Sequence, residues 1–429
     1  MSPASEPAGK RRLPLATVQL LSLLVAALLL CLGVEWACRV MLNDPTTLYT
    51  TPLRKEGVHF PDLLFFYPRF ALLHTNTFFT SSATNHFMYP AAVAPLYQLF
   101  YAAAPHIVAA YLAFSLSALL FAATLVVRAL VRRGFGVATS FGYVTVALLC
   151  TYPIWFALTQ GNIEIVIWTL LAGGVSLYWR GHGYSAMICF GVAAAAKLYP
   201  ALFLVLPLYR REWRQAIVGA VVAASYSFGS LLYVGPTFSQ ASRGIAAGLN
   251  MYNNQYMLRI REETGVDHSL FAIYKLLFRN HVPAGGFTEA LPIYLGVMTF
   301  VVLALLATRV RRLPPVNQLA FCFVVCVLFP PVSFEYTLLN ILTLATLLLF
   351  FLVDAVRADK RVPGLLQALL CCMVCLMFLP ELIYSGHQIG GQVKSLSLIV
   401  LLWTVLRYPF QTGVAPMQPG IASRIVMHV

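Results

Sequence analysis

A succession of long apolar runs is the feature that most constrains this chain of 429 residues. A helix needs about 20 apolar residues to cross a bilayer. Charged residues make up only 10% of the chain, whereas soluble domains contain about a quarter, so a soluble enzyme is excluded. A disordered chain is excluded as well, because it would be poor in apolar residues. We therefore predict an all-α, polytopic transmembrane helical bundle with about ten to thirteen membrane segments. The runs lie at 15–37, 89–104, 107–127, 137–158, 163–178, 185–208, 215–235, 290–308, 317–332, 336–353, 364–382 and 393–406.

Basic residues are concentrated between the apolar runs. The chain has 29 Lys and Arg against 15 Asp and Glu, a formal net charge of +14. In a soluble protein this excess would suggest nucleic acid, but here it follows the positive-inside rule for cytoplasmic loops. We therefore expect no nucleic-acid partner, and a multi-pass protein of the plasma (inner) membrane surrounded by membrane lipids. The clusters expected in the cytoplasm are Lys10–Arg12, Arg128/Arg132/Arg133, Arg180, Arg210/Arg211/Arg214, Arg309/Arg311/Arg312 and Arg357/Lys360/Arg361.

Two segments cannot be simple crossings if every basic cluster is cytoplasmic. Between 89 and 127 the chain must cross only once, so part of it lies flat or re-enters. The run 185–208 has basic residues on both flanks, so it must enter the membrane and return. It carries Lys197 in its middle, followed by Tyr199-Pro200. These features predict two half-length helices that meet at Lys197, which is tolerated where backbone lines a polar cavity.

In this topology the unusual polar residues collect on the extracytoplasmic side. No separate soluble domain is predicted, so residues 1–429 form a single integral-membrane domain. Its longest hydrophilic stretches are a first external loop at 38–88 and a second at 236–289. Polar groups at membrane depth are costly, so several of them on one face indicate a functional site.

Asp62 is the candidate general base of this site. It opens the aromatic stretch Phe60–Phe79 in the first external loop, where partial desolvation would make a carboxylate more basic. Asp44 lies in a turn-like segment and Glu56 in a charged cluster, so both are weaker candidates. The alternative is that Asp62 only caps a surface helix.

Further polar residues stand inside or beside the apolar runs. Gln160, Asn162 and Glu164 lie at the mouth of a span, where Asn162 could instead be a helix cap. Lys197 could bind an anion such as a lipid phosphate, or it could pair with Glu164 as a structural bridge.

The segment Phe329–Asn340 joins two later spans. Two prolines end the first span, and Ser333 and Glu335 are predicted to face the external side; the alternative is that they cap the next helix. Walker A, H-E-x-x-H and G-x-S-x-G signatures are absent from the sequence, as is the D-x-D pair of metal-assisted nucleotide-sugar chemistry. The nine cysteines lie mostly in apolar runs and indicate core positions. We therefore predict no cofactor and no metal.

Taken together, these segments resemble the GT-C superfamily of integral-membrane glycosyltransferases, and most of all glycosyltransferase family 87, the polyprenyl-phosphate-mannose-dependent mannosyltransferases. The resemblance covers residues 15 to about 345. Its most specific piece is Lys-x-Tyr-Pro before a basic turn. The motifs are Pro61-Asp62 to Tyr67, Phe87-x-Tyr89-Pro90, Gln160-Gly161-Asn162, Lys197-Leu198-Tyr199-Pro200 with Arg210-Arg211-x-Trp213-Arg214, and Pro331-x-Ser333-Phe334-Glu335.

The resemblance implies inverting transfer of a sugar, with mannose the first choice, from a polyprenyl-phosphate donor to a lipid or glycan acceptor on the extracytoplasmic face. The family's catalytic carboxylate falls on Asp62, and the lysine near the donor phosphate falls on Lys197. Arg69 and Arg259 are further candidates for the donor phosphate. The candidate substrate-binding residues are Tyr89, Gln160, Asn162, Glu164, Tyr199, Ser333 and Glu335.

One motif departs from the family pattern. Members often carry a histidine about two residues after the serine of the last motif, whereas Glu335, Tyr336 and Thr337 follow Ser333-Phe334 here. This departure leaves the role of the segment, and with it the sugar and the acceptor, open.

Two other functions would use the same residues. A transporter or flippase of a lipid-linked or anionic substrate would line its path with the buried charges, but the long first loop and the lack of a visible repeat weigh against it. A membrane scaffold would leave Lys197 and Glu164 unexplained.

Overall fold

The computed structural model describes residues 60–80, 87–260, 262–281, 287–357, 364–379, 383–384, 387–388 and 390–410, with isolated positions between 22 and 40. The predicted first span lies largely outside the described residues, and Asp44 and Glu56 lie wholly outside them. The described chain is helical apart from one two-stranded ladder, in which β1 (Ile383–Tyr384) pairs antiparallel with β2 (His387–Gln388). The predicted all-α fold class is confirmed.

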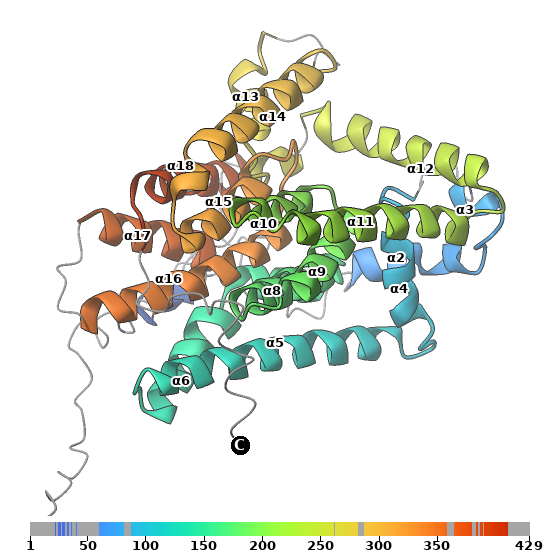
Figure 1. The fold of residues 1–429 in the computed structure, drawn as a ribbon. Coiled ribbons are helices and arrows are strands. Elements are labelled where there is room, and N and C mark those ends of the chain that lie inside the picture. Colours follow the sequence, from blue (N-terminus) through green and yellow to red (C-terminus); the bar gives the residue numbers. More distant parts are fainter. Residues whose placement is uncertain are drawn as a thin grey trace, which may run out of the picture.

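The first half of the chain supplies most of the candidate site residues. Figure 1 shows α9 packed between α8 and α11, with α5 alongside α8 and α12 set beside α11. The helices of this half are α2 (Pro61–Phe70), α3 (Thr77–Thr80), α4 (Val93–Tyr101), α5 (Ile107–Arg132), α6 (Val137–Val144), η2 (Thr145–Leu149), α7 (Tyr152–Gln160), α8 (Glu164–Trp179), α9 (Gly183–Ala196), η3 (Tyr199–Val205), α10 (Leu206–Tyr209), α11 (Trp213–Val234), α12 (Phe238–Tyr252) and η4 (Asn253–Met257).

The second half closes the bundle around α8 and η3. In Figure 1 α16, α17 and α18 gather on the side of the molecule away from α12. The helices of this half are η5 (Glu262–Gly265), α13 (Leu270–Phe278), α14 (Ala290–Thr308), η6 (Val310–Arg312), α15 (Pro315–Leu328), η7 (Glu335–Leu338), α16 (Leu339–Arg357), α17 (Gly364–Phe378) and α18 (Gly390–Arg407).

Several of these helices can cross a membrane. Among the described residues, 4 helices are long and apolar enough to do so, and a pair bent by 55°, Val137–Leu149 with Tyr152–Gln160, makes a fifth if it is one broken span. The four are Ile107–Arg132, Trp213–Val234, Ala290–Arg312 and Glu335–Leu352. Shorter apolar helices accompany them at Glu164–Trp179, Gly183–Ala196, Tyr199–Tyr209, Pro315–Leu328 and Gln367–Phe378.

Two of the long helices present apolar side chains over most of their surface. Only 17% of the apolar window of α11 and 11% of that of α14 is buried inside the protein. Phe228 on α11 and Phe300 on α14 are examples of exposed rings. A helix that is apolar all round and yet unburied is suited to hydrocarbon rather than water. We therefore assign these faces to lipid.

The segment around Lys197 is broken as predicted. Helix α9 ends at Ala196, and Lys197 itself has extended backbone angles, φ −140° and ψ 137°. The following Tyr199-Pro200 begins the short helix η3, which continues into α10. Proline cannot continue a preceding helix because its N–H is missing. This break places the lysine at the junction of two half-length helices.

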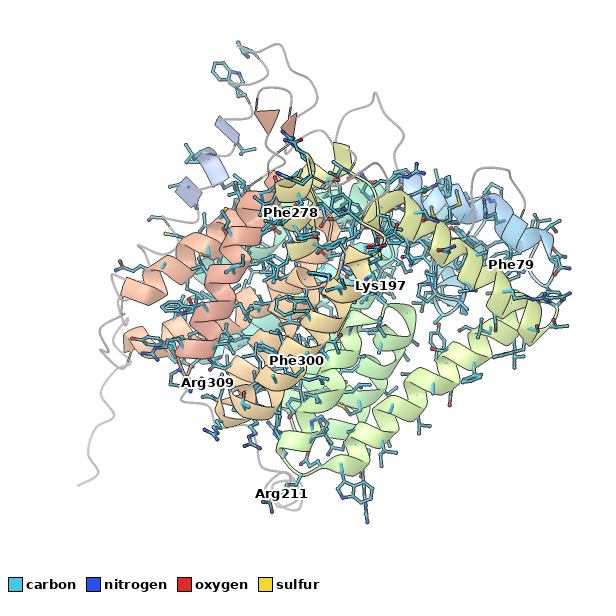
Figure 2. The ribbon with its side chains drawn as sticks, turned by 90° about the horizontal axis from the view of Figure 1, so that it is seen from above. Phe79, Lys197, Arg211, Phe278, Phe300 and Arg309 are labelled. Carbon is cyan, nitrogen blue, oxygen red and sulfur yellow. The ribbon has the colours of Figure 1, made fainter. Side chains whose placement is uncertain are left out.

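Contacts with α11 show that the chain reverses direction at this break. A Cβ on Gly183, at the start of α9, would collide with the Gln215 side chain at the start of α11. A Cβ on Gly219 would meet both Leu204 of η3 and Met187 of α9. Helices α9 and α11 therefore run in the same direction in direct contact, and η3 and α10 return alongside them. Figure 2 shows Arg211 and Arg309 at one end of the bundle and Lys197 toward the other.

The stretch from 89 to 127 also agrees with the prediction of a single crossing. Helix α5 has 26 residues, a length of about 39 Å at 1.5 Å per residue, so it can span a bilayer alone. Helix α4 has 9 residues, about 14 Å, and is too short. Under the predicted single crossing, α5 is the spanning helix and α4, which packs on α2 and α5, is the part that does not span.

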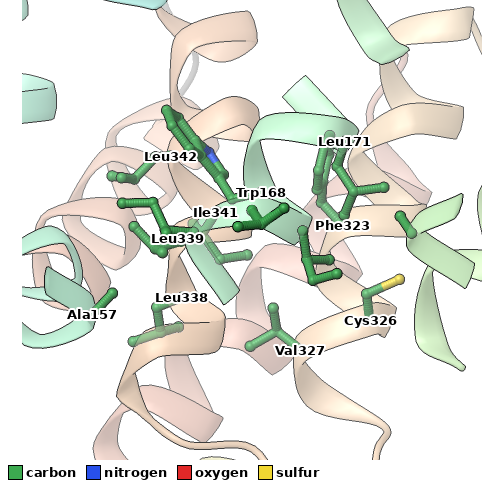
Figure 3. Close-up of a cluster of buried hydrophobic side chains, with 14 of the residues drawn as sticks. Ala157, Trp168, Leu171, Phe323, Cys326, Val327, Leu338, Leu339, Ile341 and Leu342 are labelled. Carbon is green, nitrogen blue, oxygen red and sulfur yellow. The ribbon is translucent and has the colours of Figure 1, made fainter. Parts of the chain in front are cut away.

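A dry apolar layer supports the candidate site. Figure 3 shows Ala157 of α7, Trp168 and Leu171 of α8, Phe323, Cys326 and Val327 of α15, and Leu338, Leu339, Ile341 and Leu342 of η7 and α16 packed together. All of them are buried. Close packing of this kind transmits displacements rather than absorbing them. The first turns of α8 and α16 are therefore held rigidly at the edge of the layer.

Candidate active site

Asp62 lies in the first turn of α2, and α2 is docked on the end of α7. Phe60 has the left-handed conformation, φ 59°, and donates its N–H to the Thr159 carbonyl at 2.8 Å. Pro61 follows at the start of the helix, where the missing N–H would be unsatisfied in any case. This turn brings the carboxylate of Asp62 to the junction of α7 and α8.

Gly161 allows α2 and this junction to approach closely. It ends α7 with φ 66°, a left-handed conformation that only glycine adopts without strain. A Cβ at this position would lie 2.7 Å from the Cβ of Leu63 and 3.2 Å from that of Phe60. Both the conformation and the space therefore require glycine.

Asn162 connects the candidate base to the start of α8. Its Oδ1 accepts the backbone N–H of Glu164 at 2.9 Å, and its Nδ2 donates to Oδ2 of Asp62 at 2.6 Å. An N–H can be met only by the amide oxygen, so the first bond fixes the orientation of the amide. The N-cap of α8 is Ile163 rather than Asn162, and Asn162, one residue earlier, ties the first residue of the helix to the Asp62 carboxylate.

Glu164 is fully buried and contacts three polar side chains, two by hydrogen bonds and one as an ion pair. Lys197 Nζ lies 2.9 Å from Oε2. The Nδ2 of Asn340 donates to Oε1 at 3.0 Å, and the Tyr199 hydroxyl donates to the same oxygen. The structural bridge between Lys197 and Glu164 therefore forms, and the positive charge of Lys197 balances the buried carboxylate.

Lys197 keeps part of its donor capacity. Its side chain is 15% exposed, and its Nζ lies 5.8 Å from the ring centre of Tyr89 and 5.3 Å from that of Tyr336. An ammonium has three N–H donors, so the pair with Glu164 leaves two. The bridge and the binding of an anion are therefore compatible.

Asp62 and Lys197 interact electrostatically. Burial raises the pKa of Asp62, while the hydrogen bond from Asn162 and the charge of Lys197 act in the lowering direction. The Tyr89 hydroxyl lies 3.4 Å from Nδ2 of Asn162, and burial together with the Asp62 charge raises the pKa of Tyr89 well above its ordinary value. The site therefore holds a basic carboxylate, a cation and a neutral tyrosine.

Three other residues that were predicted to belong to the site are placed on α2, on α7 and after η4. Arg69 is buried near the end of α2, two turns after Asp62. Gln160 is a half-buried residue at the end of α7. Arg259 is exposed in the bend that follows η4.

Ser333 and Glu335 are enclosed in the protein interior, so they are not exposed lining residues of the site. They are 1% and 0% exposed. Both oxygens of Glu335 accept from Nζ of Lys394 on α18 at 2.5 Å, and this lysine is also 0% exposed. A carboxylate enclosed in protein needs a counter-charge, and the first turn of α18 supplies it.

The buried residues Asp267 and His268 contact the turn 333–337 from a second side. Asp267 accepts the N–H of Ser333 at 2.9 Å, and Nε2 of His268 lies 3.1 Å from Oγ1 of Thr337. Burial raises the pKa of Asp267 to about 6 and lowers that of His268 well below its ordinary value. A histidine therefore does lie beside the turn that lacks one in sequence, but as a buried, neutral support.

Sequence reasoning missed Asn340, Tyr336 and Lys394 as site-forming residues. Asn340 is the one amide side chain in the run 336–353 and Lys394 the one charged side chain in the run 393–406, a signal that could have marked them. Tyr336 gave no such signal, because aromatic residues are common at span ends. Among the described residues, no group of three or more His, Cys, Asp or Glu side chains is placed to hold a metal ion.

This arrangement can deprotonate a hydroxyl at Asp62 and stabilise a developing anion at Lys197. The sequence model of glycosyltransferase family 87 matches residues 87–333. The chain belongs to glycosyltransferase family 87. It is a membrane glycosyltransferase. No curated protein and no solved structure matches the chain.

The matched region of the family 87 enzyme contains most of the site. Tyr89, Asn162, Glu164 and Lys197 lie within it, whereas Asp62 precedes it. The hydrogen bond from Asn162 therefore links Asp62 to the region that the family defines.

Replacing Gly161 by alanine should uncouple Asp62 from the rest of the family 87 site. The added Cβ must displace α2, and misplacement by about 1 Å can cost up to about 10²-fold in rate. We expect turnover to fall at least about tenfold and the melting temperature to drop, because a left-handed alanine costs about 1 kcal/mol or more. The matched control is Gly173→Ala in α8, where a Cβ meets nothing within 4 Å. Equal turnover in the two variants would contradict this account of the α2 docking.

Proposed function

We propose that this glycosyltransferase moves a sugar, with mannose the first candidate, from a polyprenyl-phosphate-sugar donor to the hydroxyl of a lipid or glycan acceptor, with inversion at the anomeric carbon. The observation that carries the proposal is that one short turn, Asn162–Glu164, holds both a base and a cation. Asn162 holds Asp62, and Glu164, two residues later, holds Lys197.

The proposed reaction is a single displacement. Asp62 accepts the proton of the acceptor hydroxyl, whose oxygen forms a bond to the anomeric carbon while the bond from that carbon to the phosphate oxygen breaks. The donor phosphodiester carries one negative charge, and the departing phosphate monoester gains a further charge. Lys197 therefore interacts more strongly with the leaving group than with the donor, which is the condition for accelerating the reaction.

The geometry supports this division of roles. The base and the cation must flank the sugar, because attack and departure occur on opposite faces of the anomeric carbon. Asp62 comes from α2 and Lys197 from the break after α9, and they approach the turn Asn162–Glu164 separately. The two groups are close enough for Lys197 to act on the proton affinity of Asp62.

The position of the site supports an extracytoplasmic reaction in the plasma membrane. Lys197 lies toward the end of the bundle opposite to Arg211 and Arg309. Basic residues mark cytoplasmic loops, so the proposed site faces the other compartment. A donor whose lipid lies in the bilayer can reach this position without a soluble carrier.

The test is to supply the detergent-purified protein with labelled polyprenyl-phosphate mannose, polyprenyl-phosphate glucose and the nucleotide sugar GDP-mannose, together with membrane lipid extract as acceptor. We expect label to move to the acceptor from a polyprenyl-phosphate sugar and not from the nucleotide sugar. Transfer from GDP-mannose alone would overturn the donor class. Movement of an intact lipid-linked sugar across reconstituted vesicles, without any transfer in detergent, would favour a flippase.

A further inference from the structure

The residues of the turn 333–337 alternate between the interior and the site. Ser333, Glu335 and Thr337 are buried and bonded to Asp267, Lys394 and His268. The residues between them, Phe334 and Tyr336, are half-buried. The bonds of Ser333, Glu335 and Thr337 therefore fix the side of the turn on which the rings of Phe334 and Tyr336 lie.

The ring of Tyr336 lies beside Lys197, the cation of the site. Its ring centre lies 5.3 Å from Nζ of Lys197. The ring stacks on Phe156 of α7, with centres 6.3 Å apart and planes inclined by 23°, and it meets Phe334 edge-on at 6.0 Å. Aromatic neighbours on two sides hold the ring in a defined orientation.

Tyr89 provides a second ring beside the same lysine. Its centre lies 5.8 Å from Nζ of Lys197 and 5.6 Å from the ring of Phe66. Tyr89 also reaches Asn162, and hence the Asp62 side of the site. Tyr89 and Tyr336 therefore both lie beside Lys197, and Tyr89 also adjoins the Asp62 side of the site.

From this placement we infer that Tyr336 is the residue that recognises the sugar ring of the donor, by contact of its aromatic face with the C–H groups of a pyranose. The inference rests on the proposed function. A sugar is bonded directly to its phosphate, so a phosphate on Lys197 holds the sugar within reach of a ring 5.3 Å from that nitrogen. The ring face is electronegative and attracts C–H hydrogens that carry partial positive charge.

The experiment compares the binding of two ligands that differ only in the sugar. Dissociation constants for polyprenyl-phosphate mannose and for sugar-free polyprenyl phosphate are measured on the detergent-purified full chain. We expect Tyr336→Ala to weaken binding of the sugar-bearing ligand about tenfold, a loss typical of one aromatic contact, and to leave the sugar-free ligand unchanged. Tyr336→Phe keeps the ring and should retain most of the binding.

Two controls separate recognition from stability. Tyr336→Leu keeps apolar bulk without a ring and should reproduce the selective loss if the alanine variant folds poorly. Tyr184→Ala removes an exposed tyrosine near the start of α9 and should change neither constant. Equal weakening of both ligands in the Tyr336 variants would overturn the inference and assign the ring a structural role. Failure of the unchanged protein to bind either ligand would instead overturn the proposed lipid-phosphate donor.

Discussion

Replacing Asp62 by asparagine is expected to lower turnover by about 10²-fold or more, because general-base catalysis contributes roughly 10²- to 10⁴-fold. The change is nearly isosteric. The new side-chain oxygen can still accept from Nδ2 of Asn162, which now bonds Asp62 at 2.6 Å. Donor binding and the melting temperature should therefore change little, and the measurement is steady-state turnover beside donor affinity.

The pH dependence gives the same experiment a second readout. The base must be ionised, so turnover of the unchanged enzyme should fall as pH drops through the pKa of Asp62. Burial raises that pKa above the ordinary aspartate value, so the fall should begin at higher pH than for an exposed carboxylate. The remaining turnover of Asp62→Asn should not show this fall at low pH.

Asp44→Asn is the matched control for Asp62→Asn, because both carboxylates lie in the stretch 38–88 that is predicted to be the first external loop. We expect Asp44→Asn to cost far less. Near-normal turnover in Asp62→Asn together with an inactive Asp44→Asn would mean that the base has been assigned to the wrong residue.

Replacing Lys197 by methionine should weaken donor binding and lower turnover by about 10²-fold, the usual effect of removing one group that stabilises a developing anion. Methionine keeps the length of the side chain without the charge. It also leaves Glu164 buried with only Tyr199 and Asn340 as donors. Loss of one partner from a buried pair can cost about 3–5 kcal/mol of stability, so a loss of activity alone would be ambiguous.

The double variant Lys197→Met with Glu164→Gln resolves this ambiguity. It removes the unpaired charge and should restore the melting temperature. If Lys197 holds the donor phosphate, binding should stay weak in the restored protein. Recovery of donor binding along with stability would make Lys197 a purely structural partner of Glu164.

The break at Lys197 was predictable because local sequence and topology agreed. Basic residues flank the run 185–208, and Tyr199-Pro200 follows a lysine at membrane depth. The basic residues on both flanks required the chain to return to the same side, and Pro200 explains why the helix breaks at this point. The position of Asn162 beside the start of α8 was predictable for a similar reason, since asparagine favours helix starts.

The orientation of the turn 333–337 was not predictable from its own residues. The topology predicted only that Ser333 and Glu335 lie at the external end of two spans, and nothing in the segment itself indicated that both side chains would be enclosed. Their partners Asp267 and Lys394 lie far away in sequence, and only tertiary packing brings them to the turn. The same long-range packing turns Tyr336 toward Lys197.

The most direct test of the central claim, single displacement with Asp62 as the base, is the anomeric configuration of the product. Labelled polyprenyl-phosphate mannose of known configuration is incubated with acceptor and detergent-purified enzyme, and the new glycosidic bond is analysed by nuclear magnetic resonance. The account predicts inversion, one free polyprenyl phosphate for each sugar transferred, and at least about a 10²-fold slower reaction in Asp62→Asn. Retention of configuration would contradict it, because retention requires two displacements and a second nucleophile.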